Sequence, residues 1–177
     1  MTSTTSGWEA LRKRLNDIKL PTASFTICDN PDLRHTLNRA KSEHDQAQAL
    51  LATITDDTEP DVKTLRQKAS DRAAADLDKA QKAYDKASVT LRFTALERKA
   101  LEDLQKEHPP TEEEEAEGAE FRMDTFAPAL ISAASLDGMP LEDAQHFLNT
   151  WATADAQALW RAAWGVQHQQ RTDLGKG

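Results

Sequence analysis

At 177 residues, the chain has room for one ordinary domain or for a small core with extended appendages. Its composition, 38% hydrophobic and 29% charged, is that of a soluble protein, and no window approaches the roughly 20 apolar residues of a membrane span. The 30 acidic residues outnumber the 22 basic ones and give a net charge of −8, which argues against a nucleic-acid-binding surface because phosphate neutralisation needs clustered Lys and Arg.

The N-terminal residues 1–20 are predicted to form a segment of their own. Residues 7–18 have the spacing of a short amphipathic helix, and Pro21 ends it. The segment lacks the apolar run of a secretory signal peptide, and the single cysteine, Cys28, suits a reducing compartment, so we expect an intracellular protein. The apolar side of the helix consists of Trp8, Leu11, Leu15 and Ile18.

Two strand candidates lie on either side of a long helical stretch. Apolar and polar residues alternate in 23–28 and again in 89–95, which is the repeat of a strand with one buried face. Phe25 and Phe93 are placed on these buried faces. Because the stretch between the strands goes out and returns, we expect the strands to pair antiparallel and to form a β base within residues 21–96.

The stretch between the strands, residues 30–88, is predicted to be a helical hairpin. Apolar residues recur at steps of three and four in two segments, and the turn TDDTEP at 55–60 separates them. Two helices joined by so short a turn must lie antiparallel, so they form an arm. The predicted seam consists of Leu33, Leu37, Ala40, His44, Ala47, Leu51 and Ile54 in the first helix and of Val62, Leu65, Ala69, Ala73, Leu77, Ala80, Tyr84 and Ala87 in the second.

The rest of the chain is predicted to be helical with one acidic interruption. A short helix and a Pro-Pro turn fill residues 97–110, and residues 111–120, six of which are glutamate, form a charged linker that starts with a capping-box pattern. Residues 121–177 are expected to be a helical module with a flexible tail at 172–177. The predicted fold class is therefore mainly α with a small antiparallel β element, with a long antiparallel helical hairpin arm and a C-terminal helical module.

No pattern in the sequence points to an active site. The five histidines are scattered, and none stands at a spacing that would put two ligands on one metal ion. The sequence has no glycine-rich phosphate loop and no nucleophile elbow, and consecutive glutamates on a linker have no fixed geometry for catalysis. We therefore expect no catalytic, cofactor-binding or metal-binding residues, no cofactor and no enzymatic activity.

Three tryptophans and a phenylalanine gather toward the C-terminus. One interpretation is that they form the core of a small module that has little bulk elsewhere. The other is that at least one of them is a partly exposed anchor for an apolar segment of a partner, since tryptophan is enriched at interface hot spots. The candidate partner-binding residues are Phe147, Trp151, Trp160 and Trp164.

Residues 89–170 contain, in order, a strand with Arg92 and Phe93, a turn from His108 to Thr111, a helix with Phe126 to Leu130, and the closing WRAAWGVQHQQ. In this order the elements resemble the tail assembly chaperones of actinobacterial siphophages. In that family, a strand ending in an Arg-Phe element is followed by a short helix, a His-Pro-Pro-Thr turn with acidic residues, a Phe-x-Pro-Ala-Leu helix and a last helix with tryptophan.

The resemblance implies a non-enzymatic phage or prophage protein that acts in the host cytoplasm. Such a protein associates with the long tape measure protein during tail assembly and keeps it soluble until the tail tube polymerises around it. The implied partner is the tape measure protein, with no nucleic acid and no membrane. Genes of this kind commonly give a second, longer product by frameshifting, and Gly175 with Lys176 is a dipeptide that a slippery run could encode. Self-association, or association with that longer form, stays open.

Two other classes of function are consistent with the sequence. One is a structural subunit of the phage tail or connector, which would use the strands and the arm for permanent subunit contacts. The other is an adaptor or inhibitor that covers a host protein with its acidic face. Presence in purified particles would indicate the first class, and capture of a host protein would indicate the second.

Overall fold

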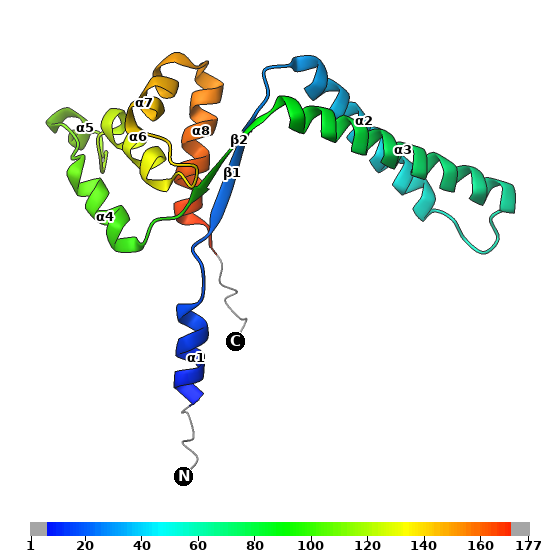
Figure 1. Cartoon of the computed structure of the whole chain (residues 1–177), viewed down its shortest axis with the longest axis horizontal. Coiled ribbons are helices and arrows are strands. Elements are labelled where there is room, and N and C mark those ends of the chain that lie inside the picture. Colours follow the sequence, from blue (N-terminus) through cyan, green and yellow to red (C-terminus); the bar gives the residue numbers. More distant parts are fainter. Residues whose placement is uncertain (1–6, 171–177) are drawn as a thin grey trace, which may run out of the picture. The chain divides into compact units, whose positions relative to one another are not determined.

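The computed structural model describes residues 7–170, and this part of the chain is mainly helical (Figure 1). It contains eight α-helices, one short 3-10 helix and one two-stranded antiparallel sheet. This confirms the predicted fold class, mainly α with a small antiparallel β element. The tail predicted at 172–177, with Gly175 and Lys176, lies outside the described residues.

The chain divides into two compact units, and the boundary between them falls within both strands. One unit contains the described residues up to Phe25 and from Leu91 onward, and the other is Thr26–Thr90. The first unit includes an N-terminal helix, α1 (Gly7–Asn16), at the place where the sequence predicts a helix over 7–18. The second unit contains the helical arm.

The two strands pair as the alternation predicts. β1 (Thr22–Ile27) and β2 (Val89–Thr94) are neighbours in one antiparallel sheet. The hydroxyl oxygens of Thr26 and Thr90 lie 2.8 Å apart across the pair. Phe25 and Phe93 are both buried, with 9% and 0% of their surface exposed. The two phenylalanines are therefore buried as the sequence indicates, whereas Val89, which the alternation places on the same face as Phe93, is 59% exposed.

The second edge of β2 is also hydrogen-bonded. Phe93 forms an antiparallel bridge with Ser135, and the N–H of Leu136 donates to the carbonyl of Arg92 over 2.9 Å. Asp137 then closes the contact, since one carboxylate oxygen accepts from the backbone N–H of Arg92 at 2.7 Å and the other accepts from its guanidinium at 2.6 and 3.1 Å. This turn joins the strand to the C-terminal helices.

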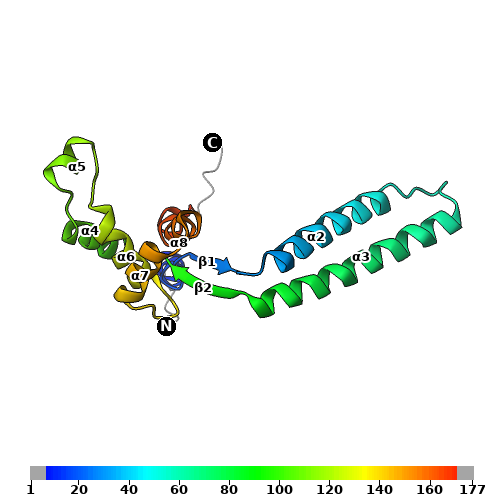
Figure 2. The ribbon, with the colours of Figure 1, turned by 90° about the horizontal axis from the view of Figure 1, so that it is seen from above.

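The arm is an antiparallel pair of helices, α2 (Pro31–Ala52) and α3 (Pro60–Ala87), which run side by side in both views (Figures 1 and 2). The start of α2 is capped by the side-chain oxygen of Asn30, which accepts from the N–H groups of Asp32 and Leu33. The buried contact between the helices is small and rich in alanine. It consists of Leu37, Ala40 and Ala80, with Leu77 and Tyr84 packed against them.

In the first half of α3 the predicted apolar seam is wrong. Leu65 is 69% exposed, whereas Ser70, which breaks the apolar pattern, is buried. Ser70 accepts a hydrogen bond from the amide of Gln48 on α2 at 3.1 Å, and the guanidinium of Arg66 donates to the carbonyl of Leu50 at the end of α2. The two helices are therefore joined here by side-chain hydrogen bonds, which a pattern of apolar residues does not indicate.

The C-terminal part of the first unit is a helical module. The interval predicted as a charged linker contains a short helix of its own, because Thr111 and Glu114 complete a capping box in which each side chain accepts from the backbone N–H of the other residue. Gly138 adopts a positive φ of 75° in the turn after α6. The helices are α4 (Arg98–Glu107), α5 (Glu112–Ala116), α6 (Met123–Ala134), α7 (Leu141–Thr150), α8 (Thr153–Gly165) and the 3-10 helix η1 (Val166–His168).

The core of the module is built mainly from α6 and α8. Phe93 of β2 is fully buried like the core residues of these helices, so the strand contributes to the hydrophobic core of this unit. The side chain of Gln167 strengthens the connection, since its oxygen accepts from the N–H of Leu96 at 2.8 Å and its amide donates to the carbonyls of Thr94 and Ala163. The residues with no exposed surface are Phe93, Phe126, Leu130, Ile131, Ala134, Ala144, Leu159 and Ala163.

We predict that Phe93→Ala lowers the free energy of unfolding by about 3–5 kcal/mol, because it removes a fully enclosed ring and leaves a cavity. Phe25→Ala should act in the same direction. Val89→Ala in the same strand, where 59% of the side chain is exposed, is the matched control and should change stability by less than about 0.5 kcal/mol. Thermal and urea unfolding would measure the three variants. Equal midpoints for Phe93→Ala and the control would contradict the buried position.

We also predict that the contact between Arg92 and Asp137 makes stability depend on pH. Hydrogen bonds from the Arg92 side chain, and then from its backbone N–H, lower the pKa of the Asp137 carboxyl in the folded state. A carboxyl with a lowered folded-state pKa stabilises the fold above its unfolded pKa of about 3.9, and this contribution is lost as pH falls through the lower folded value.

Urea unfolding of Asp137→Asn from neutral to acidic pH measures this effect. The variant should be less stable than the parent at neutral pH, and the difference should shrink toward acidic pH. Asp143→Asn, which removes an exposed carboxylate from the first turn of α7, is the control. A difference between Asp137→Asn and the parent that is constant over the whole pH range would show that the carboxylate charge contributes nothing.

Candidate partner-binding groove

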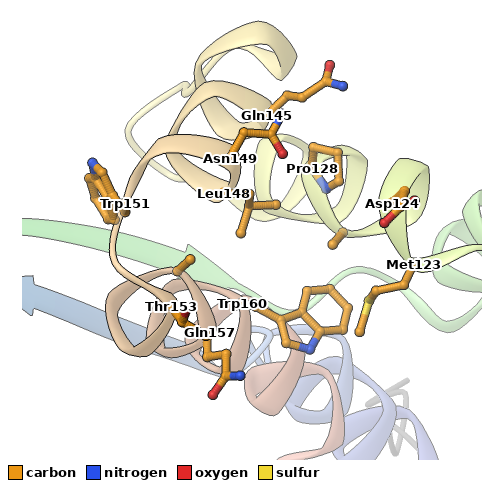
Figure 3. A pocket seen from close by; sticks show the side chains of 12 residues that line it. Met123, Asp124, Pro128, Gln145, Leu148, Asn149, Trp151, Thr153, Gln157 and Trp160 are labelled. Carbon is orange, nitrogen blue, oxygen red and sulfur yellow. The ribbon is translucent and has the colours of Figure 1, made fainter.

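The helical module carries a groove of about 680 Å³ between α6, α7 and α8 (Figure 3). One helix supplies each wall, and the segment between α7 and α8 closes one end. The apolar part of the lining consists of Met123, Ala127, Pro128, Leu148, Trp151, Ala156 and Trp160. The polar part consists of Asp124, Gln145, Asn149, Thr153 and Gln157.

The wall formed by α6 is unusual because it has a proline inside the helix. Pro128 has no backbone N–H, so the carbonyl of Asp124, one turn earlier, lacks the donor that the helix normally provides. Both residues line the groove. The start of α6 is held in place by a hydrogen bond from the N–H of Arg122 to the carbonyl of His108, at 2.9 Å. The wall therefore presents an apolar ring beside a backbone acceptor.

The wall formed by α7 is positioned by the turn that precedes it. Ser132 donates to the carbonyl of Met139 over 2.8 Å, and the N–H of Met139 donates to the hydroxyl of Ser135 over 3.1 Å. These bonds fix the end of α6 against the segment that enters α7. Leu148 of α7 then projects into the groove between α6 and α8, as Figure 3 shows.

Two of the four predicted partner-binding residues line the groove. Trp151 is stacked on Phe147 with ring centres 4.8 Å apart and lies 6.0 Å from the ring of Phe25. Trp160 is stacked on Trp164 at 5.4 Å. Trp151 thus has two aromatic rings stacked against it and Trp160 has one, and both tryptophans are only half-buried.

The other two predicted residues, Phe147 and Trp164, do not line the groove. Phe147 supports Trp151, while Trp164 meets the edges of Phe121 and Phe126 at ring-centre distances of 5.5 and 5.9 Å. The two interpretations of the aromatic group, as core and as anchor, therefore apply to different faces of the same side chains. Contact with a partner stays a prediction for all four residues.

The groove has the chemistry of a binding surface. Asp124 is the only residue of its lining that carries a charge at neutral pH, and no lysine or arginine belongs to the lining. Amide and hydroxyl groups surround the tryptophans and can donate and accept hydrogen bonds at the rim. Such an arrangement suits an amphipathic helix that places apolar side chains at i, i+3 or i+4, and i+7 in the groove.

The sequence interpretation missed the residues that complete the groove. Met123, Pro128 and Leu148 come from two helices that lie next to α8 only after the module has folded. The periodicity indicates which residues share a face of one helix, but not which faces of three helices leave a space between them. A partial signal exists in α8, where Ala156 and Trp160 are four residues apart and share one face.

A second apolar surface lies on α1. The sequence predicts a helix here, but the helix ends at Asn16, before Ile18, and none of its residues is buried. Trp8 is 62% exposed, and Leu11 and Leu15 are 51% and 54% exposed. Ile18 and Leu20, which follow the helix, are exposed as well. The described part of the chain thus presents both a groove and an amphipathic helix without a packing partner.

Comparisons with known proteins do not identify this chain: no family model, curated protein or solved structure matches it. Within residues 7–170, no helix is both long and apolar enough to cross a membrane. The same residues contain no group of three or more His, Cys, Asp and Glu side chains arranged to hold a metal ion.

Proposed function

We propose that the chain is a non-enzymatic tail assembly chaperone of a siphophage, which binds the tape measure protein in the host cytoplasm and keeps it soluble during tail assembly. The observation that carries the proposal is the groove between α6, α7 and α8, whose lining includes the half-buried Trp151 and Trp160, each stacked on a neighbouring aromatic ring. The resemblance of residues 89–170 to this class of chaperones names the partner.

The groove favours transient binding of an apolar helical segment. Tryptophans that are held by neighbouring rings lose little conformational freedom when a partner covers them, so they are efficient anchors. A single groove of about 680 Å³ accommodates a few side chains of a client rather than a whole domain. A chaperone with such a site binds one short segment of its client and releases it when the assembled structure covers that segment.

The acidic surface supports the same role. The chain has a net charge of −8, and the interval 111–120 contains six glutamates. Copies of an acidic chaperone that are bound along one long client repel each other and other acidic proteins, which keeps the complex in solution. Because the lining of the groove contains no basic residue, a neutral or basic client segment is favoured.

Co-expression with the tape measure protein tests this function. We predict that Met123→Lys combined with Asn149→Lys, two exposed positions in the groove, weakens client binding at least about tenfold and lowers the soluble fraction of the client. The matched control is Leu65→Lys combined with Val89→Lys, which places the same charges at exposed positions outside the groove. It should retain client solubility.

The possible outcomes separate the site from the function. Equal client solubility with the groove variant and the control would exclude the groove as the binding site. A client that is insoluble even with the parent protein would contradict the chaperone function. Mass spectrometry of purified phage particles adds a further check, because a chaperone should be absent from them and a structural subunit should be present in many copies.

A further inference from the structure

The exposed apolar side of α1 requires a partner. Of the 11 large hydrophobic residues that are exposed in the described chain, five fall within residues 8–20, so this surface is concentrated rather than scattered. A helix of 10 residues is also shorter than the roughly 12–15 residues that an isolated helix needs to be even marginally stable in water. The helix is therefore expected to be stabilised by burying its apolar side.

The charge of α1 is opposite to that of the rest of the chain. The helix contains three basic residues, Arg12, Lys13 and Arg14, against the single acid Glu9, which gives +2. The whole chain carries −8, so the remainder carries −10. At 3.6 residues per turn, Arg12 and Arg14 border the apolar side on its two edges, and Lys13 lies opposite to it. Positively charged side chains thus lie along both edges of the apolar side of α1.

The groove of the C-terminal module has the complementary features. Its centre is apolar and aromatic, with Trp160 and Leu148 facing the open space (Figure 3). Its polar edge carries Asp124 on α6, and Glu142 lies on α7 one turn before the groove residue Gln145. An amphipathic helix bordered by arginines fits such a groove by shape and by charge.

We propose that α1 of one copy of this chain docks into the groove between α6, α7 and α8 of a second copy. Trp8, Leu11 and Leu15 cover the groove tryptophans, and Arg12 and Arg14 face the acidic edge. The helix does not occupy the groove of its own chain, because every residue of α1 is exposed. The inference does not rest on the proposed function, since both surfaces belong to this chain and the test needs no other protein.

The geometry of this contact determines the kind of assembly. The helix and the groove are different surfaces, so the contact is heterologous, and each copy that joins leaves one free helix and one free groove. Copies therefore connect head to tail in a longer assembly, or two copies exchange their helices and close a dimer. If the groove also binds a client segment, that segment has to displace α1, which makes assembly and client binding mutually exclusive at each groove.

Light scattering coupled to size-exclusion chromatography, over a concentration series of the full chain, tests the proposal. The helix variant is Leu11→Asp combined with Leu15→Asp, and the groove variant is Met123→Lys combined with Asn149→Lys. Each should be a monomer where the parent and the control, Leu65→Lys combined with Val89→Lys, form concentration-dependent oligomers. All substituted side chains are exposed, so the thermal midpoints should agree with that of the parent.

Mixing the two variants gives the decisive result. The groove variant keeps an intact helix, and the helix variant keeps an intact groove, so an equimolar mixture can form one contact only and should give a 1:1 dimer and nothing larger. A mixture that remains monomeric would overturn the proposal. Assembly of the groove variant to the same size as the parent would also overturn it, because it would indicate pairing between two α1 helices.

Two further outcomes would assign α1 to another partner. A parent protein that is monomeric over the whole concentration range overturns the proposal, and sedimentation of that monomer with anionic vesicles would place α1 on a membrane surface instead. If the groove variant unfolds, Asp124→Lys, which changes a single exposed residue of the lining, replaces it. This variant should weaken assembly, and unchanged assembly would exclude the acidic edge as the docking site.

Discussion

The structure depends on the hydrogen bonding of one short strand along both of its edges. β2 pairs with β1 on one edge and with Ser135 and Leu136 on the other, while its Phe93 is completely buried. The hydrogen bonds on the second edge are made by Arg92, whose side chain is 63% exposed, so they fix the position of the turn after α6 rather than satisfy buried backbone groups. The turn that pairs with this edge also ends α6 and leads to α7. The pairing of the strand thus determines where two walls of the groove begin.

In the arm, the spacing of apolar residues predicts the helices but only part of the contact between them. The steps of three and four residues correctly predict two antiparallel helices, and Leu37, Ala40 and Ala80 are buried as expected. The prediction fails at Leu65, because Arg66 and Ser70 face α2 instead. Arg66 donates a hydrogen bond to the carbonyl of Leu50 at the end of α2, and Ser70 accepts one from Gln48. A polar or amphipathic side chain can face a partner helix when it finds a hydrogen-bonding group there. Such groups are known only when the partner helix is in place.

The candidate site could be predicted in part for a similar reason. Tryptophans near the C-terminus are visible in the sequence, and two of them line the groove. Which of them line the groove is not visible in the sequence. Trp160 and Trp164 lie on one helix face four residues apart and differ only in what packs against them. The proline of α6 is visible in the sequence, but its place beside a groove is not. Its effect on the carbonyl of Asp124 becomes relevant only because that face of the helix lines a groove.

The two unpaired surfaces also constrain each other. An exposed aromatic groove and an exposed amphipathic helix are both liabilities in a protein that must stay soluble, since each would bind unrelated apolar segments. Placing them in one chain with opposite charge at their borders lets copies of the protein cover both, while the acidic remainder limits other associations. If a client binds the groove that we propose α1 to occupy, the client has to compete with α1, which raises the affinity it must reach before it is bound. Selectivity for the client follows from this competition, and the groove itself need not recognise a detailed sequence.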